Sequence, residues 1–337
     1  MKMKKIMAWL MAMVMTGSLM ACGAPQEQAA GGGGTEAAEE GAEEGAVYKV
    51  GICQLVQHEA LDAATLGFTE ALKEALGEQV VIEEQNASND QATCATIINQ
   101  FVASDVDLIM ANATPALQAA IAATDTIPIV ATSITDYATA LELSDWTGTT
   151  GINVTGTADL APLAEQAAMI KELVPEAKKV SVLYCSAEPN SKYQSDIVTM
   201  ELQNLGLEVE EFTFADSNDV MLVTEAAAAE ADVIYVPTDN TVASNTEIIN
   251  SVAEDVGVPI IAGEEGICKG CGIATLSIDY YSIGYRAGEM AAEILADGAD
   301  PATMEIDFAK ELTKKAVASR CEALGIEIPE GYGMIEE

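Results

Sequence analysis

From Val47 onward, short apolar runs alternate with longer segments of helical period, and this alternation restricts the fold more than any other feature of the sequence. Short apolar runs bounded by polar residues predict buried strands, and helical segments between them predict parallel pairing of those strands. We therefore expect an α/β fold whose parallel sheets are flanked by helices. The predicted strands span residues 49–55, 79–84, 108–111, 127–131, 180–184, 208–214, 233–236, 259–262 and 273–276.

The helical segments carry apolar residues at intervals of three and four. In the first of them these positions run from Leu61 to Leu76, and Gly77 follows where a C-terminal cap belongs. The last long segment contains Gly284 and Gly288 four residues apart, which predicts close packing of one helix face on its sheet. Further helices are expected at residues 91–103, 115–123, 162–173, 191–205, 240–255 and 280–296.

Polar residues follow nearly every predicted strand. Ligands of open parallel sheets bind beyond the carboxyl ends of the strands, where helix N-termini present unpaired N–H groups. Any one of these residues would be explained by helix capping, worth about 1 kcal/mol, but capping explains less well why so many gather at strand ends. The candidate ligand-binding residues of these loops are Gln57, Asn86, Thr114, Ser133, Thr135, Asp136, Asn190, Asp239, Asn240, Glu264 and Glu265.

The N-terminus has the features of an export signal. Lysines at positions 2, 4 and 5 precede an apolar run that is shorter than the roughly 20 residues of a bilayer-spanning helix, so residues 1–21 are predicted to be a signal peptide. Ala21 before Cys22 resembles the lipobox of bacterial lipoproteins, and we predict lipidation of Cys22. The alternative is ordinary secretion with Cys22 unmodified. Residues 22–46, rich in Gly, Ala and Glu, predict a disordered acidic tether.

Charge and cysteine usage exclude other classes. The net charge of −39 argues against a nucleic-acid partner, which needs clustered Lys and Arg. Six cysteines follow Cys22, and only Cys268 and Cys271 lie close together in sequence. A zinc site would need a second ligand pair, and His58 is the only histidine, so we expect no metal. A local disulfide between Cys268 and Cys271 and two free thiols both remain open.

Several segments, in order along residues 47–329, closely resemble the substrate-binding proteins of the tryptophan/tyrosine-type ABC importer family. They are VGI at 50–52, QHEALD at 57–62, ATPA at 113–116, IPIV at 127–130, NVTGT at 153–157, YVPTDNT at 235–241 and IDYYSIGY at 278–285.

The resemblance implies the type I periplasmic-binding-protein fold, in which two Rossmann-like lobes are joined by three crossover segments and hold the ligand between them. The crossovers are expected near residues 153–157, 278–279 and 304–308. The N-terminal lobe would then comprise residues 47–155 and 279–304, and the C-terminal lobe residues 156–278 and 305–337.

The same resemblance implies an aromatic or other apolar amino acid as the ligand. Its α-carboxylate would take hydroxyls and N–H groups at helix N-termini, and its α-ammonium would take carboxylates. The side chain would lie against an apolar or aromatic wall. The residues assigned to these roles are Thr114, Ser133 and Thr135 for the carboxylate, Asp239, Glu264 and Glu265 for the ammonium, and Tyr184, Tyr193 and Tyr280 for the wall.

Two segments depart from the family pattern. Gln57 and Glu59 stand where relatives commonly show a Glu-His-Pro-Ala-Leu-Asp-like start, and Glu264 stands where an aspartate is familiar in the acidic loop. Either change would retune the choice of ligand.

These features predict a binding protein, not an enzyme. The sequence has no glycine-rich phosphate loop and no nucleophile elbow, and Cys53 lies within an apolar strand pattern, where core packing explains it better than catalysis with His58 does. We expect a monomer without a cofactor, anchored to the outer face of the cytoplasmic membrane, whose partners are an ABC permease and its ATPase. A ligand sensor that feeds a signalling receptor is the alternative, because it would use the same cleft.

Overall fold

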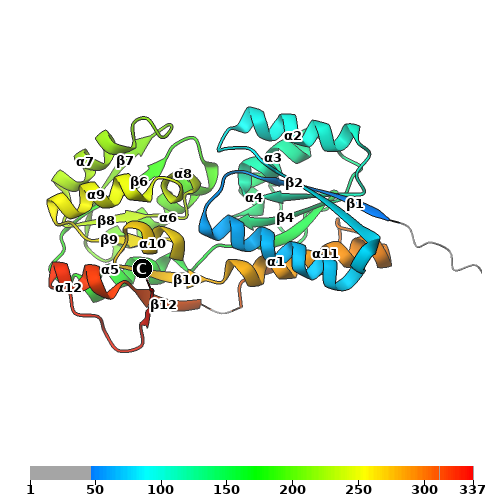
Figure 1. The fold of residues 1–337 in the computed structure, drawn as a ribbon. Helices are drawn as coiled ribbons and strands as arrows, with labels where there is room; N and C mark the ends of the chain where they lie inside the picture. Colours follow the sequence, from blue (N-terminus) through cyan, green and yellow to red (C-terminus); the bar gives the residue numbers. More distant parts are fainter. Residues whose placement is uncertain (1–46, 311, 337) are drawn as a thin grey trace, which may run out of the picture. The chain divides into compact units, whose positions relative to one another are not determined.

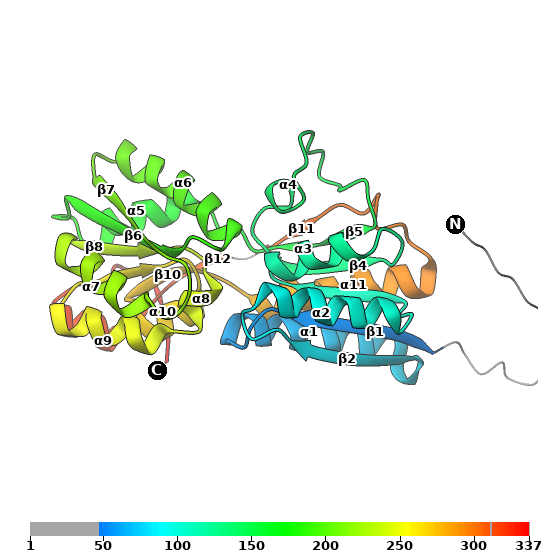
Figure 2. The same cartoon turned by 90° about the horizontal axis from the view of Figure 1, so that it is seen from above.

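The fold is described by a computed structural model, which covers residues 47–310 and 312–336. The predicted signal peptide, the lipidation of Cys22 and the tether therefore lie outside the described residues. Within the described residues, the chain forms two α/β lobes, each built on one sheet whose strands are mainly parallel (Figures 1 and 2).

The first lobe has a six-stranded sheet whose strands are all parallel. Its spatial order is β11 (Asp307–Phe308), β5 (Val154–Ala158), β4 (Ile129–Ile134), β3 (Leu108–Asn112), β1 (Tyr48–Gln54) and β2 (Val80–Asn86). Helices α1 (Glu59–Leu76) and α11 (Tyr280–Asp297) cover one face, and α2 (Gln91–Ala103) and α3 (Thr114–Ala123) cover the other (Figure 1). The central strand β3 is buried at every position because helices cover both faces of the sheet.

The second lobe has a seven-stranded sheet. Its order is β13 (Gly333–Met334), β12 (Leu312–Ala316), β10 (Ala274–Ile278), β9 (Ile260–Ala262), β8 (Val233–Val236), β6 (Lys179–Cys185) and β7 (Glu208–Phe214). β12 runs antiparallel to its neighbour β10, and β13 runs parallel to β12. The helices of this lobe are α5 (Leu163–Leu173), α6 (Pro189–Asn204), α7 (Val220–Glu230), α8 (Asn240–Ala243), α9 (Thr246–Val256), α10 (Glu265–Cys271) and α12 (Ala318–Leu324).

Two short helices complete the first lobe: α4 (Tyr137–Ala140) follows β4, and a 3₁₀ turn, Gly77–Gln79, follows α1. The turn begins at Gly77, whose φ of 57° suits glycine, and the backbone N–H of Gly77 bonds to the carbonyl of Lys73. The predicted C-terminal cap is therefore confirmed.

The chain passes three times between the two sheets: after β5, between β10 and α11, and between β11 and β12. The last passage lies later than the predicted segment 304–308. Asp307 and Phe308 pair with Thr157 and Ala158 and so extend the first sheet by one short strand. β5 likewise stays in the first sheet as far as Ala158, beyond the predicted limit at residue 155.

Two further expectations about helices were wrong. The glycines of α11 pack on helix α1 and not on the sheet, since a Cβ at Gly284 would lie 2.0 Å from the carbonyl oxygen of Ala64. The predicted helix 240–255 is two helices, α8 and α9. Between them, Ser244 Oγ and Asn245 Nδ2 donate to the carbonyls of Asn240 and Thr241, and these local bonds compete with helix continuation.

Candidate functional site

The loops at the carboxyl ends of the two sheets contact each other. His58 Nε2 lies 3.2 Å from Asn240 Oδ1, and Asn89 Nδ2 donates to Thr241 Oγ1 at 2.9 Å. In each pair the first residue follows β1 or β2 and the second follows β8. The strand ends of both lobes therefore form one polar boundary, as ligand sites of parallel sheets require.

One part of this boundary has the features of an anion site. β4 carries one extra residue relative to β5 between Ala131 and Ile134, and within this bulge Ser133 adopts a φ of 58°. Its hydroxyl is buried and has no hydrogen-bond partner among the described residues. The next strand end has the same strain: Ala113 adopts a φ of 89°, and its N–H bonds to Thr132 O.

Ala113 is also the residue before α3, and it offers no side chain to cap that helix. The first N–H groups of α3 thus lack a side-chain acceptor, and Thr114, 3 % exposed, is the first residue of the helix. An uncapped helix N-terminus favours a negative group through its free N–H donors and its dipole. Thr114 and Ser133, which were both predicted for carboxylate binding, lie on adjacent strand ends.

Asp159, directly after β5, is the centre of the second part of the site. It is 3 % exposed and accepts hydrogen bonds from Tyr280 Oη at 2.8 Å and from Thr135 Oγ1 at 3.3 Å. Burial raises the pKa of Asp159 above its ordinary value, and the bonds from Tyr280 and Thr135 offset part of that rise. No Lys or Arg of the described chain pairs with it. A buried carboxylate with spare lone pairs and no cation is suited to an ammonium group.

Helix α6 of the second lobe completes this cluster. Gln194 Nε2 lies 3.4 Å from Thr135 Oγ1 and 3.1 Å from Thr238 O, while Gln194 Oε1 accepts from Thr238 N. A relay of hydrogen bonds therefore runs from Gln194 through Thr135 to Asp159 and links the two lobes. Asn190, one turn earlier, is buried, and its Oδ1 has no partner among the described residues.

Asp239, Glu264 and Glu265, predicted as ammonium ligands, already have partners. Asp239 caps α8 by accepting from Val242 N and also accepts from Cys185 N at 2.7 Å. Glu264 caps α10, and Glu265 accepts from Ser277 and Lys315. Burial raises the pKa of Asp239 to about 8 and that of Glu264 to about 7. The structure therefore gives Asp239 and Glu264 capping roles, whereas Glu265 pairs with Lys315.

The other predicted residues lie at separate places. Gln57 is exposed and lines a cavity of about 540 Å³ between the β1 loop and α10. Asn86 accepts from Ser88 N in a turn, and Asp136 caps α4. Tyr184 lies in the second sheet, where its hydroxyl donates to Glu211 of β7. Asn240 and Tyr280 lie at the boundary between the lobes, as described above.

Sequence analysis missed Asp159 and Gln194. Asp159 follows a segment that the family resemblance implied to be a crossover, and it is followed by Leu160 and Ala161 instead of a polar cluster. Gln194 lies inside a helix and not in a strand-end loop. The only signal for Asp159 was an acidic residue one position beyond a run of buried β-branched and small residues.

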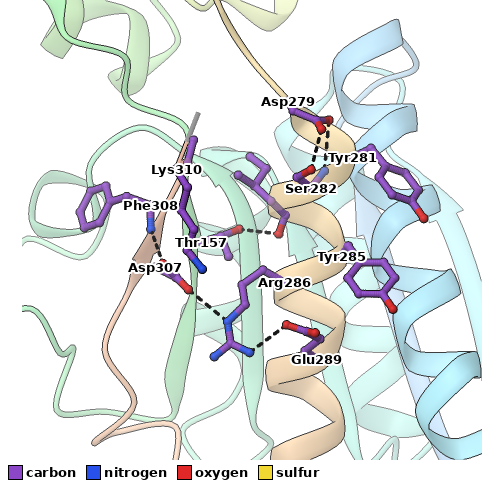
Figure 3. A pocket seen from close by; sticks show the side chains of 12 residues that line it. Thr157, Asp279, Tyr281, Ser282, Tyr285, Arg286, Glu289, Asp307, Phe308 and Lys310 are labelled. Atoms are coloured by element: carbon purple, nitrogen blue, oxygen red, sulfur yellow. Dashed lines mark hydrogen bonds and ion pairs between the residues drawn. The ribbon is translucent and has the colours of Figure 1, made fainter. Parts of the chain in front are cut away.

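A second cavity, of about 560 Å³, lies beside the hinge and not at the strand ends (Figure 3). Two cations line this cavity, Lys310 and Arg286, and Arg286 is already paired with Asp307 at 3.1 Å and with Glu289 and Glu293. Figure 3 shows Arg286 between Asp307 and Glu289, with Thr157 bonded to the backbone of Ile283. Because Arg286 is already paired with three carboxylates and the cavity lies away from the strand ends, it is a poorer candidate for the ligand site.

No metal site or disulfide is found in the described part of the chain. Its histidine, cysteine and acidic side chains form no group of three that could hold a metal ion. Cys268 and Cys271 are free and buried, as are the other four thiols from Cys53 to Cys321. Among residues 47–310 and 312–336, no helix has the length and apolarity to span a bilayer.

Two α/β lobes, three passages of the chain between them and a polar boundary at the strand ends are typical of two-lobed proteins that bind a small molecule. The model of the family "ABC transporter substrate binding protein" matches residues 49–332, and the chain belongs to that family. Members are non-enzymatic components of transport, and the substrate-binding proteins of ABC importers act outside the cytoplasm. The fold is the type I periplasmic-binding-protein fold, which confirms the predicted class.

Three relatives are similar over most of their length. The tyrosine-binding protein of Clostridioides difficile (strain R20291) is 40 % identical over 249 residues, which cover 73 % of this chain and 72 % of the relative. An ABC domain from Streptococcus pneumoniae in complex with L-Trp is 32 % identical, with a TM-score of 0.82 over 86 % of this chain and 99 % of that one. The ligand-free, open structure of a substrate-binding protein with adhesive properties from Clostridium difficile is 36 % identical, with a TM-score of 0.66 over the same shares.

Proposed function

We propose that this protein is a lipid-anchored substrate-binding protein that captures an aromatic amino acid between its two lobes and delivers it to an ABC importer. The observation that carries the proposal is the Asp159 carboxylate, which is buried between the lobes and has no cation of the described chain beside it. An α-ammonium group would supply that cation. The relatives named for tyrosine and solved with L-Trp support an aromatic amino acid as its source.

In this proposal the two charged groups of the amino acid have different partners. The ammonium lies against Asp159 and is oriented by Tyr280 and Thr135, which hold the carboxylate from both sides. The α-carboxylate takes the uncapped N-terminus of α3 and the partnerless hydroxyl of Ser133. Each charged group would thus meet its complement in a desolvated site, where charge-assisted hydrogen bonds are strong.

The aromatic side chain is assigned to the second lobe. Tyr193 of α6 is half-buried and faces Asp136 of the first lobe, and the Asn190 carboxamide lies one turn before Gln194 on the same helix. A tyrosine ligand would offer its hydroxyl to the partnerless Asn190 Oδ1, whereas a phenylalanine ligand would leave that oxygen unpaired. We therefore expect a preference for tyrosine or tryptophan over phenylalanine.

Capture would proceed by rotation of one lobe against the other about the three crossings. The TM-score is higher against the L-Trp complex, 0.82, than against the ligand-free open structure, 0.66, although the open structure is more identical in sequence. This order is expected if the lobes here are arranged as in a ligand-bound protein. Ligand shifts such a balance only through contacts that it makes in the closed form, and the assigned groups come from both lobes.

A binding screen tests the assignment of the ligand. The 47–337 segment would be titrated with the twenty amino acids and with aromatic acids that lack the amino group, by thermal shift and then by calorimetry. A ligand at a concentration about 100 times its Kd adds about 2.7 kcal/mol to the unfolding free energy. We expect this stabilisation with tyrosine and with tryptophan. Stabilisation only by compounds without an ammonium group would refute the proposal.

Anchoring and delivery need separate experiments in cells. Replacement of Cys22 by Ser should release the protein from membranes and abolish labelling with a fatty-acid probe. Deletion of the gene should lower uptake of the labelled amino acid. If uptake is unchanged while a transcriptional response to the amino acid disappears, the protein is a sensor and the transport role is wrong.

A further inference from the structure

Glu188 is a buried carboxylate beside the site described above, and its Oε2 accepts from Asn190 Nδ2 at 3.2 Å. It lies in the loop between β6 and α6, directly before Pro189, and is 4 % exposed. Its Oε2 accepts from the backbone N of Asn240 at 3.0 Å and from Asn240 Nδ2 at 2.7 Å. Its Oε1 accepts from the backbone N of Thr241 at 2.8 Å and from Thr241 Oγ1 at 2.7 Å.

These four bonds fix which atoms Asn240 and Thr241 present to the first lobe. An asparagine amide has one donor end and one acceptor end, so binding of Asn240 Nδ2 to Glu188 leaves Oδ1 to face His58 Nε2. A threonine hydroxyl has one proton, so its donation to Glu188 leaves the Thr241 oxygen to accept from Asn89 Nδ2. Both residues therefore face the first lobe as acceptors.

The two first-lobe residues are matching donors. Asn89 donates through its amide, and His58 must carry its proton on Nε2 to bond Asn240 Oδ1. Burial lowers the pKa of His58 and so favours the neutral ring, although Asn240 and the nearby carboxylates of Glu188 and Asp62 act in the opposite direction. Two donors on one lobe thus meet two acceptors on the other.

From this geometry we infer that Glu188 is a positioning residue for lobe closure. Because Glu188 accepts the hydrogen bonds that Asn240 and Thr241 can donate, these two residues face the first lobe as acceptors that fit the donors of His58 and Asn89. The inference rests on the proposed hinge closure. It adds that part of the closing free energy is independent of the ligand, since none of these atoms belongs to the assigned amino-acid site. A cap for α8 alone would not require Glu188, because Asp239 already fills that role.

The primary test is Glu188→Gln, which keeps the size of the side chain but has one acceptor oxygen and an amide that must face a donor. Spin or fluorescent labels at the exposed positions Leu66 and Met221, one in each lobe, would report the distance between the lobes. We expect E188Q to shift the ligand-free distribution toward longer distances. Since two hydrogen bonds across the boundary are weakened, affinity for every ligand should fall by about tenfold.

A double-mutant cycle separates positioning from a merely structural role. The double substitution His58→Ala and Asn89→Ala should lower the affinity for the ligand in the parent protein. It should change the affinity little in the E188Q background, because the acceptors of Asn240 and Thr241 are already misdirected there. Asp239→Asn, which alters the cap of the same helix, is the matched control and should leave the effect of H58A/N89A undiminished. Equal losses in the parent and E188Q backgrounds would overturn the inference.

The ligand-free label distances keep this test independent of the proposed ligand. If no amino acid binds but E188Q still opens the protein, the assignment of the ligand fails and the role of Glu188 stands. If ligands bind as proposed and E188Q leaves the distance distribution and the affinity unchanged, the role of Glu188 is wrong.

Discussion

Replacement of Asp159 by Asn tests the chemistry of the site most directly. The substitution keeps the shape of the side chain but removes its charge and turns one acceptor oxygen into a donor. Truncating one member of a buried, hydrogen-bonded charge pair costs about 2–5 kcal/mol. Because 1.4 kcal/mol corresponds to tenfold, the Kd for tyrosine or tryptophan should rise by about 30-fold to several thousand-fold.

The fold itself should tolerate this change. Burial places the pKa of Asp159 in the folded protein above its value in the unfolded chain. Over that interval the folded protein holds a proton that the unfolded chain has lost, so its stability falls as pH rises through the folded-state pKa. Asn has no proton to lose. Ligand-free D159N should therefore melt no lower than the parent at pH 8, which separates a binding defect from misfolding.

Calorimetry with matched ligands provides the decisive comparison. The parent should discriminate strongly between tyrosine and 3-(4-hydroxyphenyl)propionate, which lacks the amino group, whereas D159N should discriminate little. Asp307→Asn, in the hinge cavity of Figure 3, removes a carboxylate outside the site and should leave the affinity unchanged. An affinity of D159N equal to that of the parent, or undiminished discrimination, would refute the role of Asp159.

Three further outcomes follow from the structure. Burial and the neighbouring Glu188 raise the pKa of Asp239 to about 8, so the unfolding free energy should fall as pH rises from about 4 toward 8. Urea titrations at pH 6 and 9 should show a smaller fall in unfolding free energy for Asp239→Asn than for the parent. Equal falls in the two proteins would contradict this. Burial lowers the pKa of His58 from 6.5 when the lobes meet, so calorimetry should find that the affinity for the ligand decreases below about pH 6.5. A His58→Gln variant should lack this pH dependence. A parent protein whose affinity does not change with pH would contradict this role of His58. Gly284→Ala would place a Cβ 2.0 Å from the carbonyl of Ala64. Separating α1 from α11 should cost about 1–3 kcal/mol in denaturant unfolding, and an unchanged midpoint would mean that the helices part freely.

The alternation of strands and helices could be predicted well from the sequence because the apolar pattern of each element is local. Fully buried strands such as β3 and β8 are short apolar runs, and the helix α2 was predicted with both of its observed ends. The two-residue strand β11 could not be found in this way. Its assignment to the first sheet depends on pairing with β5, almost 150 residues earlier in the chain, and not on its own composition.

The site was predicted less completely because a helix cap and a ligand-binding residue have the same composition. Asp239 and Glu264 follow strands as a ligand-binding carboxylate would, yet both accept backbone N–H groups of the next helix. Asp159 follows a strand as well, but no helix begins immediately after it, so its carboxylate is left for Tyr280 and Thr135. What distinguishes these acids is the start of the following helix, and that is a property of the fold.

Asp159 and Glu188 are both buried carboxylates near the boundary between the lobes, and their surroundings give them opposite tasks. Glu188 accepts from five donors of its own lobe and contributes to closure whatever the ligand is. Asp159 has two hydroxyl donors and no cation beside it in the described part of the chain, so it favours closure only around a ligand that carries positive charge. The apparent Kd of such a protein is its intrinsic Kd divided by the fraction in the binding-competent form. E188Q should therefore lower the affinity for all ligands by one common factor, whereas D159N should lower it only for ligands with an ammonium group. The ratio of the affinities for two ligands that differ in this group, measured in both variants, separates the two effects.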